Sequence, residues 1–90
     1  MISRTTSAFR ELLRQLPGDI QRQARAAYRL WRQNPHHPSL HFKRVHPTAP
    51  IYSVRVGRAW HALGLRREPE QIVWFWIGSH AEYDHLLSQL

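Results

Sequence analysis

The spacing of the apolar residues changes once along this chain, and the change limits its fold. Before Pro35 apolar side chains recur every three or four residues, as on one face of a helix. From Ile51 onward they alternate with polar residues, as in a half-buried strand. Helices therefore come first and strands follow, and 90 residues suffice for one core. We expect a single α+β domain over residues 1–90.

Two helices are predicted in the first third of the chain. The first follows the polar run from Thr5 to Ser7, which supplies candidate N-caps, and its apolar face holds Phe9, Leu12, Leu13 and Leu16. The letters LPGD break this pattern, and a second helix runs from Asp19 to Asn34, before Pro35. Its apolar face holds Ile20, Ala24, Ala27, Tyr28 and Trp31. A tight turn between two helices makes an αα-hairpin.

The second helix also carries a stripe of arginines opposite its apolar face. At about 100° per residue, four side chains fall within roughly 80° of one another, and they are Arg22, Arg25, Arg29 and Arg32. Like charges on neighbouring turns repel unless something anionic binds, and no acidic residue interrupts the stripe. Two interpretations stay open. The stripe is either an ordinary solvated face or a binding surface for an anionic partner.

About four short strands are predicted after the helices. The segment NPHHPSLHFKRVHPTAP has four prolines, which indicates a loop around a short strand from Leu40 to Val45. IYSVRVG alternates between Tyr52, Val54 and Val56 on one side and Ser53 and Arg55 on the other. Gly57 allows a bend, after which AWHALGL and the nearly all-apolar QIVWFWI supply two more strands. The short spacing predicts an antiparallel meander.

A short helix is predicted at the C-terminus. Ser79 and Glu82 form a Ser-x-x-Glu capping box, and the apolar face that follows holds Tyr83, Leu86, Leu87 and Leu90. His80 thus occupies the first helical position, beside the end of a central strand. A neutral imidazole there suits a general base or a metal ligand, and the position is equally compatible with a plain solvated histidine.

The charge of the chain indicates an anionic partner. Thirteen basic residues, twelve of them Arg, oppose six acidic ones, for a formal net charge of +7. Guanidinium groups pair bidentately with phosphate or carboxylate, so we expect nucleic acid or an acidic protein segment. Cysteine is absent, and no apolar run approaches the roughly 20 residues of a membrane span. We expect a cytoplasmic protein without a membrane partner.

Polar side chains on the predicted strands, or close to the ends of those strands, form a candidate site. They are Lys43, Arg44, Arg55, His61, His80 and Tyr83. Such a surface suits RNA phosphates and proton transfer, and the same pattern also fits the solvent face of a half-exposed sheet. No three-ligand metal motif, glycine-rich phosphate loop or nucleophile elbow emerges, so neither metal nor cofactor is expected. The four tryptophans occupy apolar positions and are expected in the core: Trp31, Trp60, Trp74 and Trp76.

The order of elements and several motifs resemble the RelE/ParE superfamily of bacterial toxins from type II toxin–antitoxin systems. The motifs are LP..I...A, NP.HPSL.FK, YSVRVGRAWHALGL and WIGSHAEYDHLL, and the resemblance spans Phe9 to Leu87. It implies an N-terminal αα-hairpin packed on a small antiparallel sheet of about four strands, with a short C-terminal helix. RelE-like members cut messenger RNA on the ribosome, whereas ParE-like members poison DNA gyrase on the same fold.

The resemblance also implies roles for single residues. Arg55 matches a position where RNA-cleaving relatives bind phosphate, and His61 stands where many members have Arg. His80 is similar to the terminal histidine that RelE-like toxins use in cleavage, and Tyr83 lies near a functional C-terminal tyrosine. Further contacts to the RNA backbone are expected from Lys43, Arg44 and Arg58. The implied reaction is attack of a ribose 2′-hydroxyl on the adjacent phosphate, with His80 or His61 for proton transfer, Arg55 for the phosphate, and Tyr83 for stacking or orientation.

Three functions therefore stay open. The first is a ribosome-associated, metal-independent mRNA endoribonuclease, or mRNA interferase, that inhibits translation and docks on ribosomal RNA through the stripe Arg22 to Arg32. The second is a DNA gyrase inhibitor in which His80 and Arg55 have no catalytic task, and the third is a degenerate, inactive toxin. Either active version implies a cognate antitoxin whose acidic, amphipathic segment wraps the basic cleft and is disordered when free.

Overall fold

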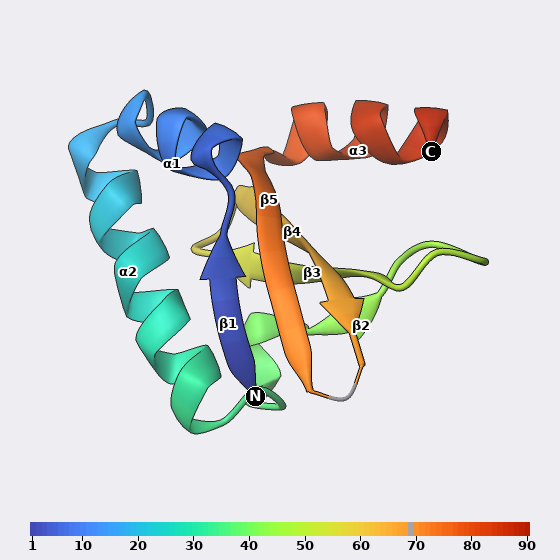
Figure 1. The fold of residues 1–90 in the computed structure, drawn as a ribbon. Coiled ribbons are helices and arrows are strands. Elements are labelled where there is room, and N and C mark those ends of the chain that lie inside the picture. The colour runs from blue at the N-terminus through green and yellow to red at the C-terminus, as the bar shows by residue number, and fades with distance from the viewer. Residues whose placement is uncertain (69) are drawn as a thin grey trace.

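A computed structural model describes residues 1–68 and 70–90 of the chain. Figure 1 shows a sheet with helices on both sides of it. In chain order the elements are β1 (Ile2–Thr5), α1 (Ser7–Arg14), α2 (Gly18–Gln33), the 3-10 turn η1 (Pro38–Leu40), β2 (Lys43–Arg44), β3 (Ile51–Val56), β4 (Trp60–Arg67), β5 (Gln71–Ser79) and α3 (His80–Gln89). The predicted α+β architecture, a helical hairpin packed on a sheet with a helix at the C-terminus, is confirmed. The expectation that the helices come first and the strands follow is wrong, because β1 precedes α1.

The sheet has five strands in the order β1-β5-β4-β3-β2, which corrects the expected count of about four. The missed strand is β1, which pairs in parallel with β5 from Ile2 opposite Gln71 to Thr5 opposite Trp74. The sheet is therefore mixed, although β2 to β5 form the predicted antiparallel meander. The sequence did not indicate β1, because the strand has only four residues and its Ile2 is exposed. Backbone hydrogen bonds to β5 hold it at the edge of the sheet, and backbone hydrogen bonds do not require an alternating apolar pattern in the sequence.

The strand predicted from Leu40 to Val45 is shorter than expected. Leu40 ends η1 and is buried, and only Lys43 and Arg44 pair with β3, opposite Ser53 and Tyr52 respectively. The 3-10 turn explains the difference, because it takes up Leu40 and is followed by His41 in a left-handed conformation with a φ of +47°, which interrupts extended backbone before Lys43.

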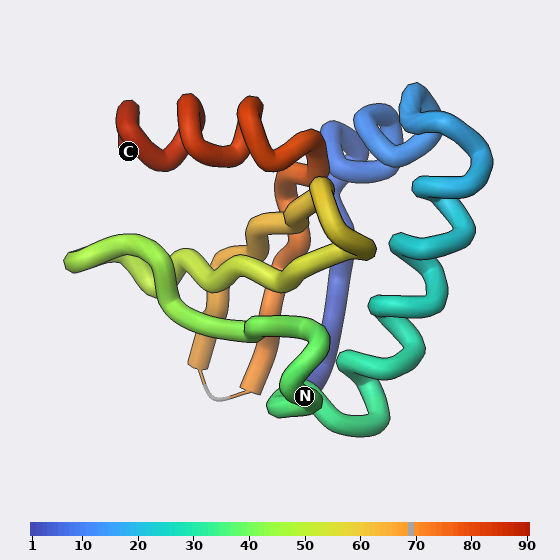
Figure 2. Tube along the Cα trace, turned by 180° about the vertical axis from the view of Figure 1, so that it is seen from behind, coloured from blue at the N-terminus to red at the C-terminus, as the bar shows by residue number. Residues whose placement is uncertain are grey.

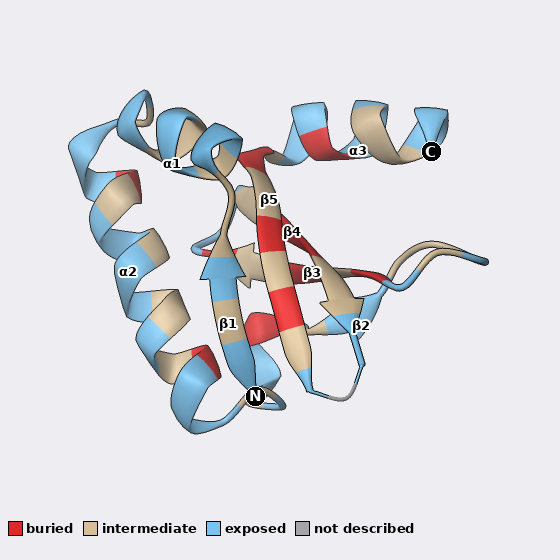
Figure 3. Ribbon diagram, viewed as in Figure 1, coloured by how far each residue is buried: buried red, intermediate tan, exposed pale blue. Residues whose placement is uncertain are grey.

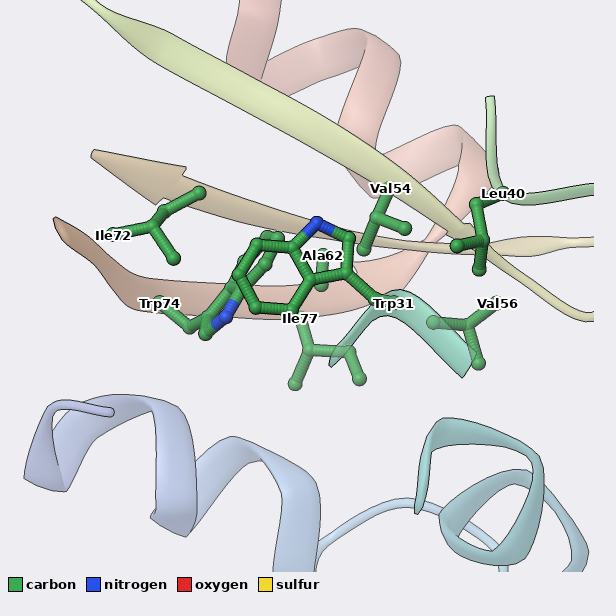
Figure 4. Close-up of a cluster of buried hydrophobic side chains, with 8 residues drawn as sticks. All are labelled: Trp31, Leu40, Val54, Val56, Ala62, Ile72, Trp74 and Ile77. Atoms are coloured by element: carbon green, nitrogen blue, oxygen red, sulfur yellow. The ribbon is translucent and has the colours of Figure 1, made fainter. Parts of the chain in front are cut away.

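The helical hairpin begins and ends close to the predicted positions. Thr6 is the N-cap of α1, and its hydroxyl oxygen accepts a hydrogen bond from the Phe9 amide at 3.0 Å. The second helix, α2, starts at Gly18 after Pro17 and ends at Gln33. Both helices cover the same face of the sheet, where the larger core cluster lies (Figure 4). Its buried members are Trp31, Leu40, Val54, Val56, Ala62, Ile72, Trp74 and Ile77.

The opposite face of the sheet packs against α3. There Ile51, Leu63 and Tyr83 are buried in a second, smaller cluster, and the alternation of burial along the strands can be followed in Figure 3. The predicted capping box is present, because Ser79 and Glu82 exchange backbone and side-chain hydrogen bonds at the start of α3. Figure 2 shows α3 and the loop between β2 and β3 projecting from the sheet on the side away from α2.

An irregularity in β5 decides which tryptophan joins which cluster. Opposite Leu63 and Gly64 of β4 stand Trp76 and Trp74, so Phe75 is the extra residue of a β-bulge. Trp74 therefore packs in the larger cluster and Trp76 in the smaller one. Trp31 and Trp74 are buried and the other two tryptophans pack partly buried against the clusters, which confirms the expected core role of all four.

None of the helices in residues 1–68 and 70–90 is long and apolar enough to cross a membrane.

Candidate functional site

A polar cleft of about 530 Å³ opens on the face of the sheet that packs against α3. Its lining comes from β2, β3, β4 and α3 and from the loops beside them, and consists of His41, Lys43, Ser53, Arg55, Arg58, His61, His80, Tyr83 and Asp84. The four residues that the resemblance implied for catalysis are all among them. The cleft thus collects side chains from residues 41 to 84 at one place.

Arg55 and His61 are brought together by the hairpin of β3 and β4. They are register partners in the antiparallel ladder, so their side chains leave the sheet on the same face. The turn between the strands starts at Gly57, which has a φ of +60° that favours glycine. The predicted bend at Gly57 is thereby confirmed, and it places Arg55 beside His61.

His80 joins the pair from the start of α3. Its backbone amide donates a 2.7 Å hydrogen bond to the carbonyl of Ala59, which fixes the first turn of α3 beside β4. His61 lies opposite Gly78 in the β4–β5 ladder, two residues before His80. The result is a hydrogen bond of 2.8 Å between His61 Nε2 and His80 Nδ1. Two histidines that are 19 residues apart in the chain therefore form one hydrogen-bonded pair.

Tyr83 packs against the ring of His61. It is buried, its ring stacks on the imidazole of His61 with centroids 4.1 Å apart and planes 15° apart, and its hydroxyl donates to Ser53 Oγ at 3.2 Å. Ser53 is itself buried. One face of the Tyr83 ring is thus covered by His61, so this arrangement suits orientation of His61 better than stacking of a nucleobase.

Asp84 is the acidic residue in the lining of the cleft. Its Oδ2 lies 3.2 Å from Nε2 of His80, one helical turn earlier on α3. The cations in the same lining are Lys43, Arg55 and Arg58. The cleft therefore carries a net positive charge and suits an anion with several oxygen atoms, such as a phosphodiester.

The electrostatic environment of His61 favours the neutral form of its imidazole. Partial burial lowers the pKa of its imidazole below 6.5, and the neighbouring His80, Arg55 and Lys43 lower it further, while Asp84 acts in the opposite sense. At neutral pH a neutral imidazole has a nitrogen lone pair available, which is what a general base needs.

Acidification is expected to destabilise the fold through His61. Because its pKa is lowered in the folded state, the unfolded state binds the proton more readily, and stability is lost as the pH falls from about 6.5 towards the folded-state pKa. Urea unfolding at about pH 7.5 and about pH 5.5 should show a smaller loss of unfolding free energy in His61→Gln than in the wild-type protein. An equal loss in both proteins would contradict this assignment.

The residues predicted to contact nucleic acid lie in three different parts of the structure. Lys43 and Arg58 line the cleft. Arg44 does not, because its guanidinium donates hydrogen bonds to the carbonyls of His46, Thr48 and Ala49 and so holds the loop between β2 and β3. The stripe on α2 is exposed on the other side of the sheet and cannot reach the cleft; its members are Arg22, Arg25, Arg29 and Arg32.

The sequence left three residues of the cleft unassigned. Ser53 could have been found, because the alternation in β3 already put it on the same side as Arg55. Asp84 was noticeable only through its i,i+4 spacing from His80. His41 had no signal, since it follows η1 in a left-handed conformation with a φ of +47°.

A second cavity, of about 510 Å³, lies between the helical hairpin and the sheet. Its walls are mostly apolar, from residues such as Phe9, Leu13 and Ile77. Three arginines add positive charge to it, and these are Arg10, Arg25 and Arg29. Two members of the α2 stripe thus border an apolar groove, which an amphipathic segment with acidic residues would fit.

Comparison with known proteins agrees with the predicted family. The sequence profile of the ParE-like toxin domain matches residues 18–85. A chain of the RelB–RelE antitoxin–toxin complex from Methanococcus jannaschii is 17% identical and superposes with a TM-score of 0.70 over 91% of this chain and 96% of that chain. No curated protein sequence gave a significant match.

Two further solved structures share the fold. YafQ from E. coli strain BL21(DE3) is 9% identical, with a TM-score of 0.71 over 90% of this chain and 94% of that one. The YoeB/ParE toxin from Agrobacterium tumefaciens is 10% identical, with a TM-score of 0.66 over 89% and 99% of the two chains. At such identities the structures establish the fold, while the sequence profile, which matches most of the chain, establishes the family. The chain belongs to the ParE-like toxin domains of the RelE/ParE superfamily, the toxins of type II toxin–antitoxin systems.

Proposed function

We propose that this toxin is a ribosome-associated mRNA endoribonuclease whose active site is the cleft between β3, β4 and α3. The observation that carries the proposal is the hydrogen-bonded pair of His61 and His80 beside Arg55. An imidazole pair supplies proton transfer near neutral pH, and a guanidinium supplies bidentate binding of a phosphate. A protein-binding surface alone needs no such pair.

The reaction follows from the groups in the cleft. A ribose 2′-oxygen attacks the adjacent phosphorus, so a bond from phosphorus to the 2′-oxygen forms and the bond to the 5′-oxygen breaks. The products are a 2′,3′-cyclic phosphate and a 5′-hydroxyl. One histidine of the pair accepts the proton of the 2′-hydroxyl, and the leaving oxygen takes up a proton. Lys43, Arg55 and Arg58 stabilise the charge that develops on the phosphate oxygens.

The arginine stripe on α2 has a separate task in this proposal. The stripe lies on α2, on the opposite side of the sheet from the cleft. It therefore cannot contact the phosphate that is cleaved. A helix face with four arginines would bind the backbone of ribosomal RNA without reading its sequence. The stripe would therefore set affinity for the ribosome, whereas the cleft carries out the chemistry.

An antitoxin is the expected protein partner. One structural relative comes from a RelB–RelE antitoxin–toxin complex. On this chain an acidic, amphipathic segment has two places to bind: the cationic cleft, and the apolar groove bordered by Arg10, Arg25 and Arg29. Binding across both would neutralise part of the +7 charge and cover the cleft.

The test is a translating extract to which purified toxin is added, with messenger RNA ends mapped by primer extension. Wild-type protein should create new ends inside codons of translated messages. The double variant His61→Ala/His80→Ala should create none, because the proton acceptor is gone, while circular dichroism confirms that it remains folded. Intact messages with the wild-type protein would refute the nuclease function, and unaffected translation and growth as well would indicate an inactive toxin.

DNA gyrase inhibition is the second candidate, because the matching sequence profile is that of a ParE-like toxin. In that case wild-type protein would inhibit gyrase supercoiling of plasmid DNA, and the histidine double variant would inhibit it equally. Messages in the extract would remain intact. The two functions therefore predict opposite results for the same pair of proteins.

A further inference from the structure

The histidine pair has four ring nitrogens, and their contacts differ. His61 Nε2 and His80 Nδ1 are hydrogen-bonded to each other at 2.8 Å. His80 Nε2 lies 3.2 Å from the Asp84 carboxylate. Within residues 1–68 and 70–90, His61 Nδ1 has no hydrogen-bond partner. A substrate can therefore meet one uncommitted nitrogen of the pair, and it belongs to His61.

Asp84 decides where the protons of the pair reside. A deprotonated Nε2 on His80 would direct its lone pair at the carboxylate oxygen, which is repulsive, so Nε2 carries the proton. A neutral His80 then has a bare Nδ1, and this nitrogen can only accept a hydrogen bond. The donor is His61 Nε2–H. With its proton on Nε2, a neutral His61 has a bare Nδ1.

We propose that Nδ1 of His61 is the atom that accepts the 2′-hydroxyl proton, and that Asp84, acting through His80, is a positioning residue that holds His61 in this tautomer. The proposal rests on the endoribonuclease function proposed above. In the step, the 2′-oxygen gives its proton to Nδ1 and bonds to phosphorus, and the leaving 5′-oxygen takes a proton from water. The positive charge formed on the histidine pair lies next to the Asp84 carboxylate, which stabilises it.

The surroundings of the pair support this division of roles. His61 is partly buried and its ring is stacked on Tyr83, which is tied to Ser53, so the ring cannot turn freely. His80 and Asp84 are exposed, with side chains 57% and 62% accessible. The remaining charged and titratable groups of the cleft are His41, Lys43, Arg55 and Arg58. None of these is an acid, so Asp84 is the carboxylate available to orient the pair in the described part of the chain.

Nuclear magnetic resonance tests the tautomers without any activity. In protein labelled with ¹⁵N, long-range proton–nitrogen spectra at about pH 8 should show His61 and His80 protonated on Nε2. In Asp84→Leu, His80 should lose this preference and His61 should show a mixture of both tautomers. His61 protonated on Nδ1 in the wild-type protein would overturn the proposal.

Cleavage kinetics provide the second measurement. Asp84→Asn should lower kcat about 10-fold to 100-fold, because misplacing a catalytic group costs that much, and should leave KM unchanged. Its pH–rate profile should also shift, which a loss of stability alone would not cause. The matched control is Asp19→Asn, which makes the same charge change in the first turn of α2. An unchanged kcat and pH profile in Asp84→Asn would overturn the role of Asp84.

The two measurements separate this inference from the function on which it rests. A wild-type protein that cleaves no messenger RNA refutes the nuclease and with it the proton transfer to His61, whatever the tautomers are. A wild-type protein that cleaves, combined with the opposite tautomer or an active Asp84→Asn, refutes only the inference. Expected tautomers together with a slower Asp84→Asn support both.

Discussion

Replacing Trp31 by alanine is expected to lower the free energy of unfolding by about 3–5 kcal/mol, the range for removing a large aromatic side chain from a core. Trp31 is 1% exposed and lies at the centre of the larger cluster (Figure 4). Its ring stacks on Tyr28 and makes edge contacts with Phe42 and Trp74. Small domains have only about 5–15 kcal/mol of stability in total, so the variant should unfold at a much lower urea concentration than the wild-type protein. Urea unfolding followed by circular dichroism measures the effect.

Trp31→Phe is the matched control for this prediction. The indole N–H of Trp31 has no hydrogen-bond partner among the described residues, so phenylalanine removes an unpaired buried donor together with part of the ring. We therefore expect Trp31→Phe to lose less than half as much stability as Trp31→Ala. Equal losses would show that the indole nitrogen contributes to stability, for example through a buried water.

The helices and their faces could be predicted because their signals are local. The helical spacing from Ile20 to Trp31 and the Ser79–Glu82 capping box each depend on a few neighbouring residues. The alternation in β3 likewise predicted that Arg55 lies on the side opposite Val54. Where one face of a helix or strand is buried, the apolar residues recur with the period of that element. The type of element and its buried face can therefore be predicted from the sequence.

The missing parts depend on pairing between distant segments. The parallel strand β1 joins β5 across about 70 residues of chain, and its polar residues have no period that predicts it. The bulge at Phe75, which sends Trp74 and Trp76 to different clusters, is a property of the β4–β5 ladder and not of either strand. The contact between His61 and His80 has the same origin, since it depends on the register that places His61 opposite Gly78.

The family shares one fold among toxins with different targets, so the site must decide the function. This chain has histidine at position 61, where, by the resemblance, many members of the family have arginine. An arginine could not accept a proton at neutral pH, whereas the histidine here is hydrogen-bonded to a second imidazole. Under the proposed nuclease function, histidine in place of arginine exchanges a fixed cation for a proton acceptor, and the cationic role would then fall on Arg55, Lys43 and Arg58.

Replacing Arg55 by alanine is expected to reduce the rate of messenger RNA cleavage about 100-fold to 1000-fold, the usual effect of removing one group that stabilises charge in a transition state. Arg55 stands directly opposite His61, and its guanidinium donates a 3.2 Å hydrogen bond to the Arg58 carbonyl, so it is held in place before substrate binds. Primer-extension assays of cleavage rate in a translating extract measure the loss. Arg55→Lys should recover part of the rate, because lysine restores the charge without the planar fork.

The control for Arg55 is Arg67→Ala, which removes the same charge from the far end of β4, where the residue is exposed and lies outside the cleft. If the rate depends on the position of the cation and not on the net charge of the protein, the Arg67→Ala variant should cleave messenger RNA at a rate within about twofold of the wild-type rate. Salt screens the interaction between a distant exposed charge and the cleft, so the loss of Arg67 should have little effect there. Equal losses in both variants would mean that Arg55 only attracts RNA electrostatically. The same comparison in a gyrase assay would show whether Arg55 serves the other candidate function instead.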